Sequence, residues 1–323
     1  MSKPICNKAF DFSYVLKKAA QIEKVITKDL GKRGIKKLLQ ENQGDLAGLA
    51  LSIAQSNSPR ILIITGFFIP YGDRPAAETD GPIGAALLFL FFKELGIPCY
   101  LLTDNLCKKA LAAVLQVCGG SEYLITLSKN DFQQTEIASL WNKLNRKILG
   151  GFSHLISIER PAKGIDGEYY NMRGKSISQY VVPLDELFQY AAKRGVISAA
   201  IGDGGNEIGM GKIKRQTIVA NLNYGEIIAS TVSCRYLIVS GVSNWGAMGL
   251  IVMLGSLRSD MVLAAAKIFT KARHLSLLSA AVAKGGAIDG VTYRQALTVD
   301  GLELQKQEEV IVQLIAILPK NFY

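Results

Sequence analysis

The spacing of apolar residues changes once along this chain, near Pro59. In residues 8–55 they recur at intervals of three and four, as at Val15, Ala19, Ile22 and Ile26, which predicts helix. After Pro59, short runs rich in β-branched residues alternate with helical patterns. Strands are predicted at residues 60–65, 98–103, 123–127, 154–158, 196–201 and 236–239. Helices are predicted at 82–95 and about 105–117, and the tail from 259 to 322 is expected to be mainly helical.

This alternation of strands and helices predicts the fold class. Strands separated by helices are typical of a mostly parallel sheet that is covered on both faces. We therefore expect a three-layer α/β/α fold. Residues 1–57 are interpreted as a helical N-terminal extension that packs on a single α/β domain formed by residues 58–323.

The composition limits the classes of protein to which this chain can belong. With 323 residues, 49% of them hydrophobic, the chain can bury a sizeable core. The longest apolar runs, residues 83–92 and 310–318, are about half of the ~20 residues that a membrane-spanning helix needs. Five cysteines form no C-x-x-C pair, and the N-terminus has no apolar signal core. We therefore expect a cytoplasmic protein with no membrane partner.

The positive net charge favours an anionic partner but does not identify its chemical class. The chain has 37 Lys and Arg residues against 27 Asp and Glu residues, and eight of the basic residues fall in residues 17–37. Such a cluster could bind nucleic acid, or it could be the solvated face of a helix. The absence of interleaved aromatic residues favours the solvated face, so no nucleic-acid partner is expected. With only two histidines, chemistry would fall to carboxylates, backbone amides, Lys or Arg.

Polar, glycine-rich segments follow four of the predicted strands, at residues 66–82, 159–174, 202–211 and 240–246. The carboxyl ends of parallel strands share one edge of the sheet, where ligands bind. We therefore expect these segments to form one convergent site. Its candidate residues are Thr65, Gly66, Glu78, Asp80, Glu159, Asp166, Asn171, Arg173, Asp203, Asn206, Glu207, Ser243 and Asn244.

Residues 202–211 carry the clearest local signal. The glycines let the backbone approach a ligand closely, and Asp203 and Glu207 offer the oxygen ligands that hard cations prefer. Carboxylates brought together repel one another unless a cation or protons intervene, so a divalent cation is expected, with Asp80 and Glu159 as further ligands. The alternative is a turn that only caps the next helix. No dinucleotide fingerprint or Walker A sequence is present, so no nucleotide cofactor is expected.

Several other candidates allow two interpretations. Asp80 could cap the helix that follows it, and Glu159 could pair with the neighbouring Arg160. Arg173 could grip a substrate carboxylate or form a surface ion pair. Ser243 and Asn244 have no base nearby in sequence and are interpreted as binding groups.

Taken together and in this order, seven segments resemble the C-terminal domain of the D-glutamate cyclase family. They are TGF (65–67), ETDGPIGA (78–85), IERP (158–161), DGEYYNMRGKSIS (166–178), PLDELF (183–188), IGDGGNEIGMG (201–211) and VSNWGA (242–247). The resemblance implies an α/β fold and conversion of D-glutamate to 5-oxo-D-proline with loss of water. It also implies, as in some stand-alone members, a divalent cation held by acidic residues.

A mechanism consistent with this resemblance assigns a role to each candidate. Mg²⁺ or Mn²⁺, with Ca²⁺ as a third option, would be held by Asp80, Glu159, Asp203 and Glu207 and would polarise the γ-carboxyl group. Glu78 or Asp166 would act as base, and Arg173 would hold the α-carboxylate of a small anionic substrate. The remaining candidates, Thr65, Gly66, Asn171, Asn206, Ser243 and Asn244, would bind the substrate. Whether the protein forms a homo-oligomer is left open.

The alternative from a different reaction class is a metal-dependent phosphatase that acts on a small phosphorylated metabolite. Residues 202–206 resemble the last acidic motif of haloacid-dehalogenase-type phosphatases. Their first motif, Asp-x-Asp after an N-terminal strand, is absent after Thr65.

Overall fold

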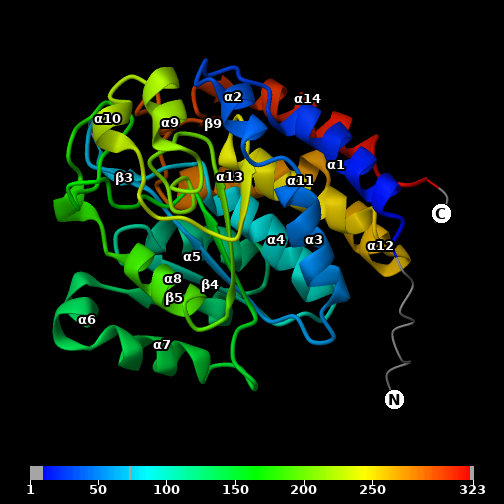
Figure 1. The fold of residues 1–323 in the computed structure, drawn as a ribbon, viewed down its shortest axis with the longest axis horizontal. Coiled ribbons are helices and arrows are strands. Elements are labelled where there is room, and N and C mark those ends of the chain that lie inside the picture. The colour runs from blue at the N-terminus through cyan, green and yellow to red at the C-terminus, as the bar shows by residue number, and fades with distance from the viewer. Residues whose placement is uncertain (1–9, 73, 321–323) are drawn as a thin grey trace.

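A six-stranded parallel sheet forms the centre of the computed structural model, which describes residues 10–72 and 74–320 (Figure 1). Each of the six predicted strands is present, with ends within one residue of those predicted. They are β1 (Ile61–Thr65), β4 (Cys99–Asp104), β5 (Leu124–Leu127), β6 (His154–Ile158), β7 (Ile197–Gly202) and β8 (Tyr236–Val239). Their order across the sheet is β5-β4-β1-β6-β7-β8. The chain therefore changes direction across the sheet between the neighbouring strands β1 and β6.

Helices cover both faces of this sheet, which confirms the three-layer α/β/α class. Ile61 and Ile63 of β1 face one helical layer, and Leu62 and Ile64 face the other. The first layer contains α1 (Phe12–Ile26), α3 (Asp45–Gln55), α4 (Pro82–Glu94), α5 (Lys108–Val117), α11 (Ser243–Gly255), α12 (Ser259–Ile268), α13 (Lys271–Ser279) and α14 (Leu304–Ile315). The second contains α2 (Ile35–Gln40), α6 (Lys129–Gln134), α7 (Ile137–Asn145), α8 (Leu184–Ala192), α9 (Arg215–Asn221) and α10 (Gly225–Ile228).

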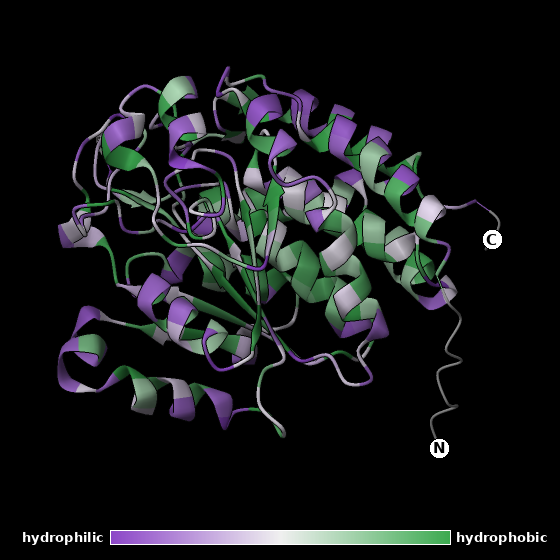
Figure 2. Ribbon diagram, in the orientation of Figure 1, coloured by the Kyte–Doolittle hydropathy of each residue, from purple (hydrophilic) through white to green (hydrophobic). Residues whose placement is uncertain are grey.

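Two helices at the centre of the first layer, α4 and α11, are apolar on nearly all sides. Every residue of α11 is buried, because α1, α3, α4, α12 and α14 surround it. Figure 2 shows this centre as hydrophobic, with polar positions concentrated on the outer helices. A helix that is apolar all round is typical of a core position. Within residues 10–72 and 74–320, no helix combines the length and apolar character that a membrane span requires.

The N-terminal helices pack closely on the rest of the molecule. Helix α1 lies beside α14 near the other end of the chain, and Lys18 Nζ donates to the carbonyl of Ile317 at 3.0 Å (Figure 1). Helix α3 contacts β8 and α11. A division into an extension and a domain at residues 57 and 58 stays a prediction.

The C-terminal tail is mainly helical, as predicted, but it contains an interval without α-helix between α13 and α14. There the chain forms a π-helical turn at Ala280–Lys284, then a loop, then a hairpin of β9 (Thr298–Val299) and β10 (Leu302–Glu303). The turn of this hairpin is Asp300-Gly301, with φ of 53° and 73°. Positive φ at both central residues is the geometry for which Asp-Gly is preferred in two-residue hairpins. This local signal outweighs the helical pattern of the flanking residues.

Candidate active site

A cavity of about 470 Å³ lies at the carboxyl edge of the sheet, beside the point where β1 and β6 meet. Crevices at such points bind ligands in doubly wound sheets. The wall includes the ends of β6 and β7, but also a loop that precedes α2 and the C-terminal hairpin. The polar residues that line it are Arg33, Glu78, Glu159, Asn171, Arg173, Asp203, Asn206, Glu207, Tyr293 and Asp300.

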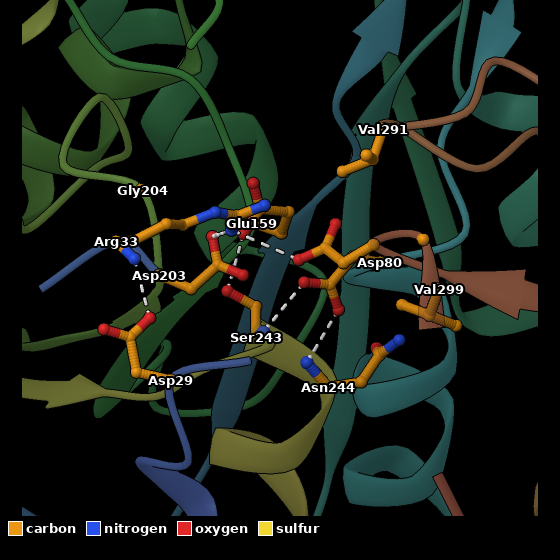
Figure 3. A network of polar contacts seen from close by, with 12 residues as sticks. Asp29, Arg33, Asp80, Glu159, Asp203, Gly204, Ser243, Asn244, Val291 and Val299 are labelled. Carbon is orange, nitrogen blue, oxygen red and sulfur yellow. Dashed lines mark hydrogen bonds and ion pairs between the residues drawn. The ribbon is translucent and has the colours of Figure 1, made fainter. Parts of the chain in front are cut away.

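Five of the predicted carboxylates, Glu78, Asp80, Glu159, Asp203 and Glu207, gather at this cavity, and each is at most 6% exposed. Asp80, Glu159 and Asp203 each place one carboxylate oxygen within 4.8 Å of the other two (Figure 3). Three carboxylate oxygens at this cavity, Glu78 Oε1, Asp203 Oδ2 and Glu207 Oε2, are buried without a hydrogen-bond partner. Buried acids with unpartnered oxygens fit a hard divalent cation, so Asp80, Glu159 and Asp203 could hold a metal.

Burial is the main reason why the pKa values of four of these acids, Glu78, Asp80, Glu159 and Asp203, are raised. The pKa values of Glu78, Glu159 and Asp203 lie well above the ordinary range, first through burial and then through repulsion by neighbouring carboxylates. Burial, together with the charge of Asp300, raises the pKa of Asp80 to about 8. Arg33 opposes the effect at Asp203. Without a divalent cation, Asp80 therefore holds a proton for much of the time at neutral pH.

Glu159 occupies a strained backbone position directly after β6. Its φ is 43°, which is uncommon for a residue with a side chain. The hydroxyl of Ser243 donates to Glu159 Oε2 at 2.6 Å and fixes the carboxylate. Gly81 gives it room, because a Cβ there would lie 3.0 Å from Glu159 Cβ and 2.6 Å from Thr65 Oγ1. Strain of this kind persists where the surroundings over-determine it, commonly at functional sites.

Glu207 organises the loop that follows β7. Its Oε1 accepts the backbone N–H groups of Asp203 at 3.1 Å and Gly204 at 2.6 Å. Asn206 Nδ2 donates to the carbonyl of Tyr170 at 2.7 Å and ties the loop to the segment after β6. The next helix, α9, begins only at Arg215 and has no side-chain cap. The alternative that this segment only caps the following helix is therefore wrong.

Asp80 and Asn244 cap each other's helices. Asp80, which precedes α4, accepts the N–H groups of Ser243 and Asn244 at the start of α11, each at 2.7 Å (Figure 3). Asn244 Oδ1 accepts the N–H groups of Gly81 at 3.0 Å and Gly84 at 2.7 Å at the start of α4. Its Nδ2 donates to the carbonyl of Thr79 at 3.1 Å. Both polar atoms of the Asn244 side chain thus have partners inside the protein. Asp80 caps α11, and it also accepts the N–H of Gly81 at 3.0 Å directly before α4.

Two charged residues that line this cavity, Arg33 and Asp300, were not among the predicted site residues. Arg33 Nη1 lies 2.5 Å from Asp203 Oδ1 and 3.2 Å from Asp300 Oδ2. Arg33 belongs to the basic cluster that was interpreted as a solvated face, an interpretation that is wrong for this residue because its side chain is only 15% exposed. The Asp300-Gly301 pair between two short β-rich runs was the available signal for a hairpin.

Other predicted residues lie at the mouth of the cavity or outside it. The Arg173 guanidinium stacks 4.3 Å from the centroid of the Tyr293 ring at the mouth, and Nη2 donates to the carbonyl of Val291 at 3.2 Å. Asn171 lines the wall, and its Oδ1 accepts the N–H of Arg173 at 3.0 Å. The structure separates Asp166 from the cavity, since this side chain is exposed and bonds to the Tyr170 hydroxyl.

Thr65 and Gly66 do not line the cavity and lie near a second ion pair, formed by Arg160 and Asp104. Arg160 pairs with Asp104 at the end of β4, and not with Glu159 as one interpretation allowed. It also donates to the carbonyls of Gly66 at 2.8 Å and Val182 at 2.7 Å. The hydroxyl of Thr65 is buried without a partner beside Gly81.

Two comparisons relate the chain to known proteins. The model of a family described as "D-glutamate cyclase-like, C-terminal" matches residues 22–315. A human protein named "D-glutamate cyclase, mitochondrial" is 35% identical over 264 residues. That alignment covers 76% of this chain and 40% of the human protein, so the chain spans less than half the length of this relative.

Proposed function

The chain belongs to the D-glutamate cyclase-like, C-terminal family, and on that premise we propose that it converts D-glutamate to 5-oxo-D-proline with loss of water. The observation that supports this most is the cavity itself, where buried acids with raised pKa values surround an arginine. Lactam formation needs a carboxylate to be neutralised and protons to be moved, and such groups supply both functions. Because the chain covers only part of its human relative, the activity of this part alone belongs to the proposal.

The proton balance of the reaction sets what the residues must do. The α-ammonium group loses two protons as the C–N bond forms, and one oxygen of the γ-carboxyl group leaves with two protons as water. No net proton is gained or lost, so one group can accept a proton from nitrogen and return it to the leaving oxygen. We assign this role to Glu78, which lines the cavity and has an unpartnered buried oxygen and a raised pKa.

Asp80, Glu159 and Asp203 are the residues that would hold a divalent cation, Mg²⁺ or Mn²⁺ first and Ca²⁺ as a third option. Such a cation, when bound, would polarise the γ-carboxyl group as a Lewis acid. Glu207, predicted as a fourth ligand, is assigned instead to ordering the loop that carries Asp203. Ser243 is assigned to fixing the Glu159 carboxylate.

Two arginines can bind the carboxylates of the substrate from opposite sides of the cavity. Arg33 lies among the acids, and Arg173 lies at the mouth. A guanidinium group can hold a carboxylate through two parallel hydrogen bonds. Asn171 and Asn206 line the same wall and offer amide groups to the substrate. Asp166, the second candidate base, takes no part in this assignment because it lies outside the cavity.

The test is to incubate the purified protein with D-glutamate or L-glutamate, in Mn²⁺ and in chelator, and to measure 5-oxoproline. We expect product from D-glutamate in Mn²⁺, a rate about 10²- to 10⁴-fold lower in Glu78→Gln, and an unchanged rate in the exposed control Glu122→Gln. Phosphate release from a generic phosphate ester, with no loss of D-glutamate, would favour the phosphatase alternative. No product from either enantiomer would contradict the proposal.

Two expectations remain predictions. The cytoplasmic location is one of them, since the human relative carries "mitochondrial" in its name. A homo-oligomeric state is the other, and light scattering of the purified protein would measure it.

A further inference from the structure

Arg33 is the cation that the acids of the cavity hold in this structure. One nitrogen, Nη1, bridges Asp203 Oδ1 at 2.5 Å and Asp300 Oδ2 at 3.2 Å. Throughout residues 10–72 and 74–320, no other ion pair reaches the acids that line the cavity. The neighbouring carboxylates keep this guanidinium charged: although burial opposes the charge, Asp203 and Asp300 hold the pKa of Arg33 well above its ordinary value.

The turn that presents Arg33 is fixed by its own hydrogen bonds. The carboxylate of Asp29 accepts the backbone N–H group of Arg33 at 2.6 Å (Figure 3). It also accepts the backbone N–H groups of Gly34 at 2.8 Å and Ile35 at 3.3 Å. Helix α2 begins directly after this turn at Ile35, which is buried against the second face of the sheet. The backbone of Arg33 is therefore anchored, and its long side chain is the part that can change partners.

One positive charge does not balance this cavity. Arg33 faces Asp203 and Asp300, while Glu78, Asp80, Glu159 and Glu207 lie in the same acidic group. Asp203 Oδ2 remains without a partner, and Asp203 is also one of the three acids that could hold a metal. A divalent cation bound to Asp203 would lie close to the positive guanidinium group of Arg33, and like charges in a buried site repel strongly. Arg33 and a divalent cation therefore compete for Asp203.

We propose that Arg33 exchanges partners within the cavity, pairing with Asp203 when no divalent cation is bound and turning to a carboxylate of a dicarboxylate substrate when a cation takes Asp203. This inference rests on the proposed function, because it takes the cation and a dicarboxylate substrate from there. Asp300 stays beside the guanidinium in both states and limits how far it moves. Cation binding then prepares the carboxylate site, and the two ligands bind cooperatively.

The first test measures Mn²⁺ affinity by calorimetry, without substrate, in the wild type and in Arg33→Gln. Removing the competing charge should tighten Mn²⁺ binding by at least about fivefold. The charge-preserving variant Arg33→Lys should bind Mn²⁺ more like the wild type. The control Lys36→Gln removes the same charge from an exposed position on α2 and should leave the affinity unchanged. Equal or weaker Mn²⁺ binding by Arg33→Gln would overturn the inference.

The second test uses glutarate, a five-carbon dicarboxylate that has no amine and cannot cyclise. In the wild type, saturating Mn²⁺ should tighten glutarate binding by at least about fivefold, and in Arg33→Gln this factor should fall towards one. The same factor in both proteins would overturn the inference. If Arg33→Gln is unstable, thermal unfolding replaces calorimetry: its melting temperature should rise more on addition of Mn²⁺ than that of the wild type. An equal rise would count against the inference.

The outcomes separate this inference from the proposed function. If the wild type binds no Mn²⁺, both the metal part of the proposed function and the exchange of Arg33 fall together. If Mn²⁺ and glutarate bind cooperatively through Arg33 but D-glutamate yields no 5-oxoproline, the exchange stands and the proposed reaction fails.

Discussion

Arg160, which is buried, and Arg33, whose side chain is 15% exposed, lie near the same edge of the sheet but differ in the acids around them. Arg160 is 1% exposed, pairs with Asp104, and gives its other hydrogen bonds to two backbone carbonyls. Asp104 in turn accepts the N–H groups of Leu106 and Cys107, each at 2.9 Å. The charges of Arg160 and Asp104 therefore balance, and both oxygens of the Asp104 carboxylate already have hydrogen-bond partners within the protein.

Arg33 is the opposite case. Its single charge is shared between Asp203 and Asp300, more acids crowd around it, and Asp203 Oδ2 has no partner. A buried ion pair with balanced charges and hydrogen bonds has a structural role. A buried group with an excess of carboxylates can still bind a cation. Charge balance, more than burial or proximity, therefore distinguishes the structural ion pair from the candidate site in this protein.

Breaking the balanced pair should give the largest effect. Arg160→Met leaves the buried carboxylate of Asp104 without its counter-ion and should lower the free energy of unfolding by about 3–5 kcal/mol, measured by urea denaturation. The matched control is Arg258→Met, which removes the partly exposed pair with Asp260 and should cost less than about 1 kcal/mol. Equal losses in the two variants would contradict the comparison.

Removing an acid from the unbalanced group should affect turnover and not folding. Asp203→Asn should lower the rate of 5-oxoproline formation by about 10²- to 10³-fold and weaken Mn²⁺ binding. Its melting temperature in chelator should equal or exceed that of the wild type, because one repulsive carboxylate is gone. Full activity of this variant in chelator would remove the metal part of the proposal.

The reciprocal caps between α4 and α11 should show an intermediate effect. Asn244→Ala removes the acceptor for Gly81 and Gly84 and should destabilise the protein by about 1–2 kcal/mol, measured by urea denaturation. Since Asn244 does not line the cavity, the KM for D-glutamate should stay within about twofold of the wild type, far below the tenfold change that loss of 1.4 kcal/mol of binding would give. A large rise in KM with unchanged stability would restore its role as a binding group.

A pH dependence of stability is also expected in the absence of a divalent cation. The pKa of Asp80 is raised from 3.8 to about 8, so the folded protein holds a proton that the unfolded chain releases. This stabilisation is complete below the unfolded pKa and is lost as pH rises through about 8. The melting temperature in chelator should therefore fall by roughly 3 °C between pH 5 and 8. Mn²⁺ should abolish this slope, and a rise in chelator would contradict the expectation.

The convergence of much of the acidic group could be predicted from the sequence. Continuous apolar runs identified β1, β6 and β7, and in a parallel sheet the residues that follow such strands must share an edge. Glu159, Asp203 and Glu207 were found for that reason. The interaction partners could not be predicted. Arg160 pairs with Asp104 at the end of another strand, and Asp80 accepts hydrogen bonds from the start of a helix far away in the sequence.

The six strands, the layered class and the loops that carry most of the acids could all be predicted from the amino-acid sequence. They depend on local periodicity and, at β1, β7 and β8, on glycines at or just after the strand end. Which charged side chains contact one another follows from the three-dimensional packing. Arg33 reaches Asp203 from a turn before α2, and Asp300 reaches Arg33 from a hairpin near the other end of the chain. Such contacts join residues far apart in sequence, and the free energy that sets their charge state comes from burial, which no local pattern encodes.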